Sequence, residues 1–257
     1  MPDHELPASV RVALWGTEVL AGRLPLGELT RRALPDLDSS TGLVDRVELW
    51  ASLGEQVVLV ALPRPGDVSG MPRSAPDLLD AATSAQECVY VPGLGGALVP
   101  TIEPYGPVGD QGWAATWTPF EADPVPVHRI EALDLGSLEL QLRTELAELT
   151  DELTAAGAAP FGATAARGRA RARRAFAGAW GLPDGMPQRA ARVIDLAGTV
   201  LTLTDAGLEA VGGSVDATSV TRREGVLRRL QGRAVTALAE ATNAAAMHLA
   251  YRGGEPH

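Results

Sequence analysis

ECVYVPGLGGALVPTIE, at residues 87–103, contains two apolar runs separated by a turn rich in proline and glycine. The runs 87–91 and 97–103 predict strands, because β-branched and aromatic side chains favour an extended backbone. Glycine tolerates the positive φ angles of a tight connection, so the PGLGG segment at 92–96 predicts a hairpin. The stretch therefore predicts an antiparallel pair of strands.

Two further runs extend this sheet. Residues 112–118, GWAATWT, space two tryptophans four positions apart, which places both on one face of a strand. Residues 56–62, QVVLVAL, are apolar throughout and predict a strand that is buried on both faces and ends at Pro63. These runs predict an α+β fold whose small mixed or antiparallel sheet packs with helices.

Helical patterns surround the strands in the first half of the chain. Residues 8–22 and 42–53 repeat apolar positions every three or four residues, which is the period of an amphipathic helix. A short helix is expected at Pro76, because proline is favoured at the first helical position and acidic residues follow it.

The second half of the chain is almost wholly helical in pattern. Ser137 and the Thr221–Glu224 pair are typical of helix N-termini. Another helix is expected to start at Pro187, and the last to end near Arg252. Long helices joined by short breaks predict an antiparallel α-helical bundle.

Charge and proline content divide the chain in the same place. Residues 1–126 hold 17 acidic residues and 7 arginines, whereas residues 127–257 hold 15 of each. Fifteen of the 19 prolines also lie in the first segment. We therefore expect two regions, an α+β region at 1–130 and an α-helical bundle region at 131–257.

The chain has no lysine, and all of its 22 basic residues are arginine. This excludes a P-loop and excludes chemistry that needs a lysine Schiff base. The composition resembles that of proteins encoded by GC-rich actinobacterial genomes. A formal charge of −10 disfavours binding to nucleic acids and to anionic membranes.

Other composition signals narrow the function classes. The single cysteine, Cys88, rules out an internal disulfide and reads as a small buried apolar residue. The four histidines form no zinc-binding pair, so neither a metal site nor a cofactor is expected. The N-terminus is acidic and no apolar run approaches 18 residues, so we expect a cytoplasmic protein without a membrane span.

The segment after the buried strand, residues 63–74, is the candidate ligand-binding site. Such long loops are often functional, and this one leaves the end of an apolar strand. Its hypothesised ligand-binding residues are Arg64, Asp67, Ser69 and Arg73. The arginines suit a carboxylate or phosphate, which accepts paired hydrogen bonds from guanidinium. The alternative is a rigid surface loop whose arginine–aspartate pairs fix its shape.

Two helical segments are candidate interaction surfaces. Arg167, Arg171 and Arg174 share one helical stripe, which pairs with the preceding acidic helix or contacts an acidic or phosphate-bearing partner. In the last helix, small residues recur at Ala237, Ala241 and Ala245, and they form either a bundle core or a homodimer seam. His248 continues this stripe and is expected in the core or at an interface.

No catalytic residue can be assigned, because the sequence lacks a nucleophile elbow and a zinc motif. The leading prediction is a non-catalytic cytoplasmic protein that interacts with a protein partner, or assembles as a homo-oligomer, through its helical region. The alternative is a small-molecule-binding protein or enzyme for an anionic ligand at the 63–74 loop. Nucleic-acid binding through the Arg167–Arg174 helix is the least favoured prediction.

Overall fold

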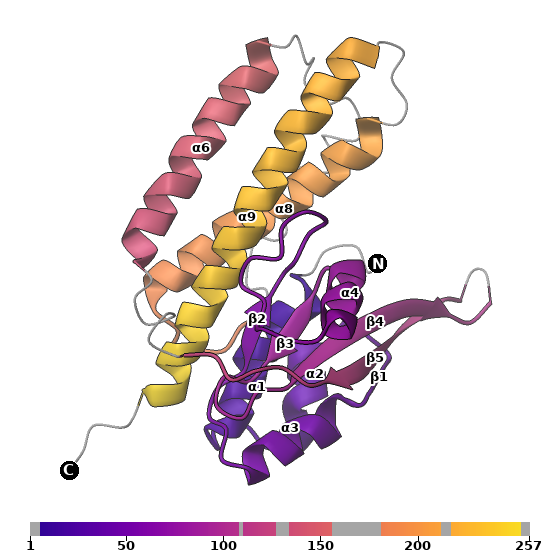
Figure 1. Cartoon of the computed structure of the whole chain (residues 1–257), viewed down its shortest axis with the longest axis vertical. Coiled ribbons are helices and arrows are strands. Elements are labelled where there is room, and N and C mark those ends of the chain that lie inside the picture. The colour runs from indigo at the N-terminus through magenta and orange to yellow at the C-terminus, as the bar shows by residue number, and fades with distance from the viewer. Residues whose placement is uncertain (1–5, 108–109, 127–133, 156–180, 212–216, 253–257) are drawn as a thin grey trace.

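A computed structural model describes residues 6–107, 110–126, 134–155, 181–211 and 217–252 (Figure 1). The strands are β1 (Ser39–Thr41), β2 (Leu59–Ala61), β3 (Cys88–Tyr90), β4 (Ala97–Tyr105) and β5 (Gly112–Phe120). The helices of the first half are α1 (Ala8–Leu20), a 3-10 turn at Leu26–Glu28, α2 (Leu29–Ala33), α3 (Leu43–Ser52) and α4 (Pro76–Ala85). Those of the second half are α6 (Leu135–Ala155), α8 (Gln188–Val211) and α9 (Ala217–Tyr251).

The five strands form one mixed sheet in the order β1-β5-β4-β3-β2. Only the β1–β5 pair is parallel, and the other neighbours are antiparallel. The α+β class is therefore confirmed, and so is the hairpin at 92–96, since β3 and β4 pair across it. The long β4–β5 hairpin extends past the helices as an arm (Figure 1).

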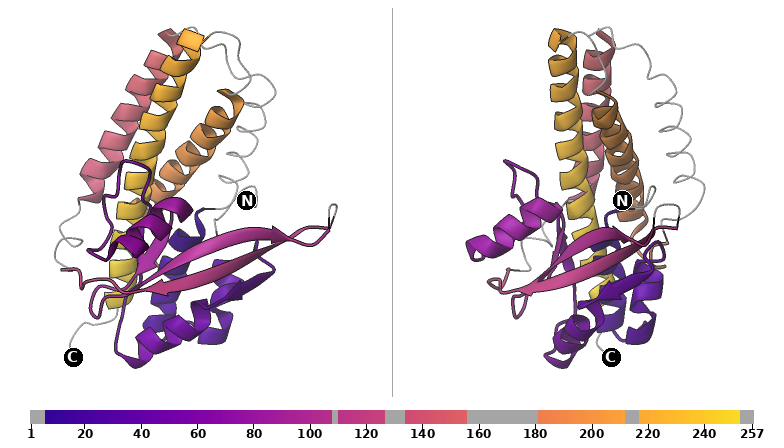
Figure 2. Two further views of the ribbon diagram at one scale, coloured as in Figure 1. Left: turned by 45° about the vertical axis from the view of Figure 1, so that its right-hand side comes forward. Right: turned by 90° about the vertical axis from the view of Figure 1, so that its right-hand side faces the viewer.

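The helices of the first half cover both faces of the sheet. Helices α1 and α3 contact the sheet on one face, and α4 lies against β4 on the opposite face (Figure 2). The predicted face of the 42–53 helix is confirmed, because Leu43, Val47 and Trp50 are all buried. The two tryptophans of β5 share one face of the strand, where Trp117 is fully buried.

In the second half of the chain, the structure corrects the predicted starts of two helices and the predicted burial of His248. Helix α6 starts at Leu135 and is capped by Asp134, whose carboxylate accepts hydrogen bonds from the Gly136 N–H and the Ser137 hydroxyl. Helix α9 already starts at Ala217, so the Thr221–Glu224 pair lies inside the helix and is no capping box. His248 is exposed, because Leu249 takes the buried position at that turn.

Helices α6, α8 and α9 contact one another in the second half. The predicted antiparallel bundle also involves residues 156–180, which lie outside the described residues, so the bundle stays a prediction. Among the described helices, none is long and apolar enough to cross a membrane.

Both halves of the chain contribute to one hydrophobic core. Its buried members run from Leu6 in the first half to Leu249 in the second. The second half reaches this core through α9, which contacts α1 and β2 as well as the other long helices. Helix α9 therefore connects the two halves through packing.

A single asparagine attaches α9 to the edge of the sheet. Strand β2 is the last strand of the sheet, so its outer edge has no strand partner there. The Val60 N–H donates to Asn243 Oδ1 at 2.8 Å, and Asn243 Nδ2 donates to the Val60 carbonyl at 2.9 Å. The asparagine amide thus replaces a neighbouring strand, which allows β2 to be buried at an edge.

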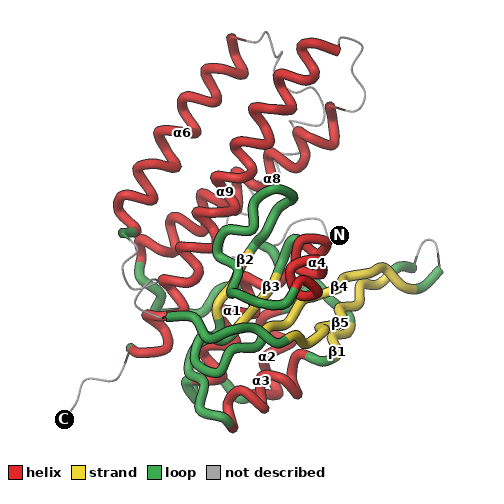
Figure 3. Tube along the Cα trace, viewed as in Figure 1, coloured by secondary structure: helices red, strands yellow, loops and turns green. Residues whose placement is uncertain are grey.

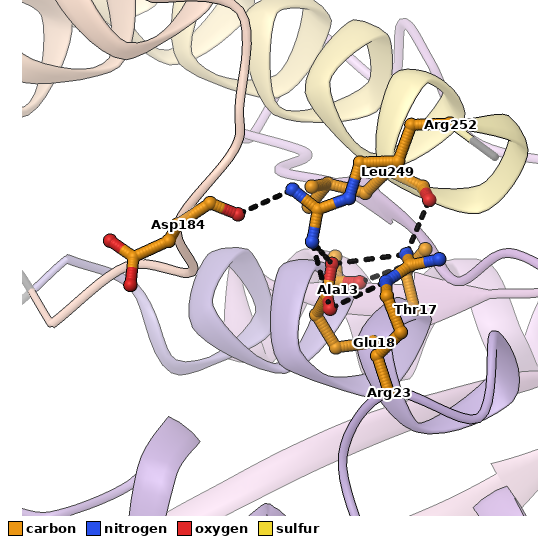
Figure 4. A network of polar contacts seen from close by, with 7 residues as sticks. All are labelled: Ala13, Thr17, Glu18, Arg23, Asp184, Leu249 and Arg252. Atoms are coloured by element: carbon orange, nitrogen blue, oxygen red, sulfur yellow. Dashed lines mark hydrogen bonds and ion pairs between the residues drawn. The ribbon is translucent and has the colours of Figure 1, made fainter.

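An ion-pair network attaches the C-terminal end of α9 to α1 (Figure 4). The Glu18 carboxylate is buried and accepts hydrogen bonds from Arg23 at 2.8 and 3.1 Å and from Arg252 at 2.9 and 3.1 Å. Arg23 also donates to the Leu249 carbonyl, and Arg252 donates to the Asp184 carbonyl. The C-terminal part of α9 is therefore fixed to the first half by polar groups at two places.

Candidate functional site

The loop that follows β2 rises beside α9 (Figure 3). Main-chain bonds close its first turn, since Arg64 and Asp67 exchange N–H···O bonds of 2.7 and 2.8 Å. The Asp67 carboxylate accepts the Ser69 N–H at 2.9 Å, and hydrogen bonds from Ser69 lower the pKa of Asp67. Asp67 therefore fixes the shape of the turn.

The loop and α9 enclose a cavity of about 310 Å³, which we call the loop–α9 cavity. Its walls come from the end of β2, the 63–74 loop, the residue after α4 and one side of α9. The polar and charged residues that line it are Arg64, Asp67, Ser69, Gln86, Arg228, Gln231, Thr236, Glu240 and Asn243. No aromatic, histidine or cysteine side chain is among the residues that line this cavity.

Arg64 is held at the start of the loop by main-chain carbonyls. Its Nη1 donates to the Gln86 carbonyl at 2.8 Å and to the Pro63 carbonyl at 3.1 Å. Its buried Nε has no hydrogen-bond partner within the described part of the chain. Burial lowers the pKa of the guanidinium, whereas the nearby carboxylates of Asp205 and Glu87 raise it. The side chain stays charged, because arginine is not deprotonated in proteins.

Arg64 also lines a second, smaller cavity of about 150 Å³ beside the start of α1. There the buried Arg11 forms a two-pronged ion pair with Asp36. The buried Glu87 accepts the Ser9 N–H at 2.7 Å in the first turn of α1, and burial raises the pKa of Glu87. These groups satisfy one another, so this second cavity offers a ligand less than the loop–α9 cavity does.

Glu240 faces the loop–α9 cavity from the helix. Its side chain is half-buried, and burial raises the pKa of its carboxyl group. The described residues give this carboxylate no hydrogen bond and no ion pair. The cavity therefore combines a restrained arginine with an uncompensated carboxylate.

Three of the four residues hypothesised from the sequence meet in this cavity. Arg64, Asp67 and Ser69 line it, but Arg73 does not. Arg73 is exposed, and its carbonyl accepts the Asp123 N–H at 2.8 Å on the other side of the loop. Arg73 therefore lies outside this cavity, and its role in ligand binding stays a prediction.

Sequence reasoning missed the wall that α9 supplies. Its members Arg228, Gln231, Thr236, Glu240 and Asn243 recur every three to five positions. That spacing marks a polar stripe on an otherwise alanine-rich helix. The stripe was visible in the sequence, but its position opposite the 63–74 loop was not.

The structure describes only one of the two sets of proposed interaction residues. Ala237, Ala241 and Ala245 are at most 2% exposed, packed within this chain's own core. Their burial fits the bundle-core alternative. Arg167, Arg171 and Arg174 lie outside the described residues. Within the described part, no group of three or more possible metal ligands occurs.

Comparison with known proteins places the two halves in one family. Residues 9–132 match the model of the Rv1486c-like protein, N-terminal domain, and residues 136–239 match that of the Rv1486c-like protein, C-terminal domain. No curated protein and no solved structure matches the chain.

Proposed function

The chain belongs to the Rv1486c-like family, and from its cavity we propose that it binds a small anionic ligand, a carboxylate or a phosphate, between the 63–74 loop and α9. The observation that carries the proposal is Arg64, a half-buried guanidinium that lines the cavity. Guanidinium is the side chain best suited to hold a carboxylate or phosphate through paired hydrogen bonds.

Two further features support ligand binding. Main-chain carbonyls already restrain Arg64, so less side-chain freedom is lost when a ligand binds. Arg228 lines the same cavity and presents a second guanidinium there, although it also forms an exposed ion pair with Glu224. We favour this function over assembly through the helical region, because the three alanines on which the assembly seam rested are buried within the chain.

The first prediction compares two arginines of the same loop. NMR titration with acetate, propionate, butyrate and inorganic phosphate is expected to show binding to the unaltered protein. Arg64→Gln is expected to weaken that binding by about tenfold or more, because it removes charge-assisted hydrogen bonds. Arg73→Gln changes the net charge equally but lies outside the cavity, so binding should be retained.

Arg64→Gln also removes a charge beside Glu87 and Asp205, so the variant's fold is checked by circular dichroism. Arg228→Gln is a second test, because that side chain is exposed and lines the cavity. Equal binding by unaltered protein, Arg64→Gln and Arg228→Gln would overturn the proposal, and so would equal loss in Arg73→Gln.

A further inference from the structure

We infer that the ligand of the loop–α9 cavity is a small aliphatic zwitterion, such as an amino acid, whose cationic group pairs with Glu240. This inference rests on the proposed function and narrows its ligand class. It depends on which charges around the cavity already have partners, and on which charge does not.

The positive groups near Glu240 are already paired with other carboxylates. Arg233 lies 3.3 Å from Glu145, in a small cavity between α6 and α9 that Glu240 also lines. Arg228 lies 2.6 Å from Glu224, one helical turn away. Neither arginine forms an ion pair with Glu240, so no side chain in the described structure supplies its counter-charge.

A half-buried carboxylate without a partner is costly, because it has lost part of its hydration and gained nothing in return. Burial is the only cause that raises the pKa of Glu240, which agrees with the missing partner. An ammonium group in the cavity would restore the lost interaction. Asp67, on the opposite wall, adds a second negative charge to the same space.

The charge balance and the apolar lining define the rest of the ligand. Arg64 brings a positive charge to the same space as the carboxylates of Glu240 and Asp67, so a zwitterion matches the cavity better than a simple anion does. The apolar lining is aliphatic, from Val60, Leu62, Val235 and Ala239. Without an aromatic ring in the lining, the cavity offers no stacking surface, which favours an aliphatic ligand over a nucleobase.

The test uses pairs of probes that differ only in the amine. Glycine, β-alanine and γ-aminobutyrate are titrated beside acetate, propionate and butyrate, and binding is followed by NMR. At least one amino acid is expected to bind about tenfold or more tightly than its parent acid. Glu240→Gln should remove that advantage without weakening the binding of the parent acids, because it takes a negative charge out of the cavity.

Glu209→Gln is the matched control, because Glu209 is exposed on α8 and does not line the cavity. This variant should still bind the amino acid more tightly than its parent acid. Parent acids that bind as tightly as their amino acids would overturn this inference and leave the proposed function intact. If Glu240→Gln still binds an amino acid more tightly than its parent acid, this inference is also overturned. Absence of binding by every probe would overturn both proposals together.

Discussion

Replacing Asn243 with leucine is expected to lower the free energy of unfolding by about 2–4 kcal/mol. Leucine has a similar volume but cannot bond to the backbone of β2. The Val60 N–H and carbonyl would then be left without partners in a fully buried strand. An unpaired buried backbone group costs about 1–3 kcal/mol, and here two are lost together. Urea unfolding followed by tryptophan fluorescence measures the change.

The neighbouring residue supplies a control for this prediction. Thr242 is also buried, but among the described residues its hydroxyl donates only to the Leu238 carbonyl of its own helix. Thr242→Val is therefore expected to change the free energy of unfolding by less than about 1 kcal/mol. A smaller loss in Asn243→Leu than in Thr242→Val would show that the asparagine does not stabilise the sheet edge.

The second large effect is expected at Glu18. Glu18→Gln removes the charge that two arginines share and is expected to lower the free energy of unfolding by about 2 kcal/mol. The carboxylate is 7% exposed, but the arginine side chains are 31% and 26% exposed. Water can therefore partly solvate the two arginine side chains when Glu18 loses its charge. The decrease in the free energy of unfolding is then smaller than for a fully buried ion pair.

Glu28→Gln is the matched control for Glu18. Glu28 pairs with Arg31 three residues along the chain, and that arginine is 71% exposed. Such surface pairs contribute about 0–1 kcal/mol, so the control should unfold almost as the unaltered protein does. Equal destabilisation by the two substitutions would contradict a specific role of Glu18 in attaching α9 to α1.

Local sequence patterns predicted strands β2 to β5 and helices α1, α3 and α4, but neither β1 nor α2. The strand and hairpin predictions at 87–103 depended on β-branched runs and a glycine turn, and both signals act between near neighbours. The capping box at Thr221–Glu224 was wrong because the same residue types also occur inside a helix, and α9 begins one turn earlier. Local signals thus identified the elements better than their ends.

Only part of the candidate site could be predicted from the sequence. Arg64, Asp67 and Ser69 were found because they share one loop with an unusual composition. Asn243 and Glu240 were not found, because a polar stripe on an alanine-rich helix resembles a solvated face. Asn243 acts on a strand 183 residues away in sequence, and no local spacing encodes that contact.

The loop–α9 cavity can be tested directly through a glycine in its wall. Gly232 lines the cavity, and a Cβ atom placed there meets no atom within 4 Å. Gly232→Leu should therefore fill part of the cavity without a clash at its Cβ atom. The matched control is Gly225→Leu, since Gly225 lies on the same helix with equally open space but outside the cavity. Both variants should be up to about 1 kcal/mol more stable, because leucine favours helix more than glycine does.

The deciding measurement is NMR titration of these two variants with the amino acids and carboxylic acids named above. Our account predicts that Gly225→Leu binds the probes as the unaltered protein does, whereas Gly232→Leu remains folded and loses binding. Undiminished binding by a folded Gly232→Leu protein would contradict the claim that the cavity between the 63–74 loop and α9 is the ligand site.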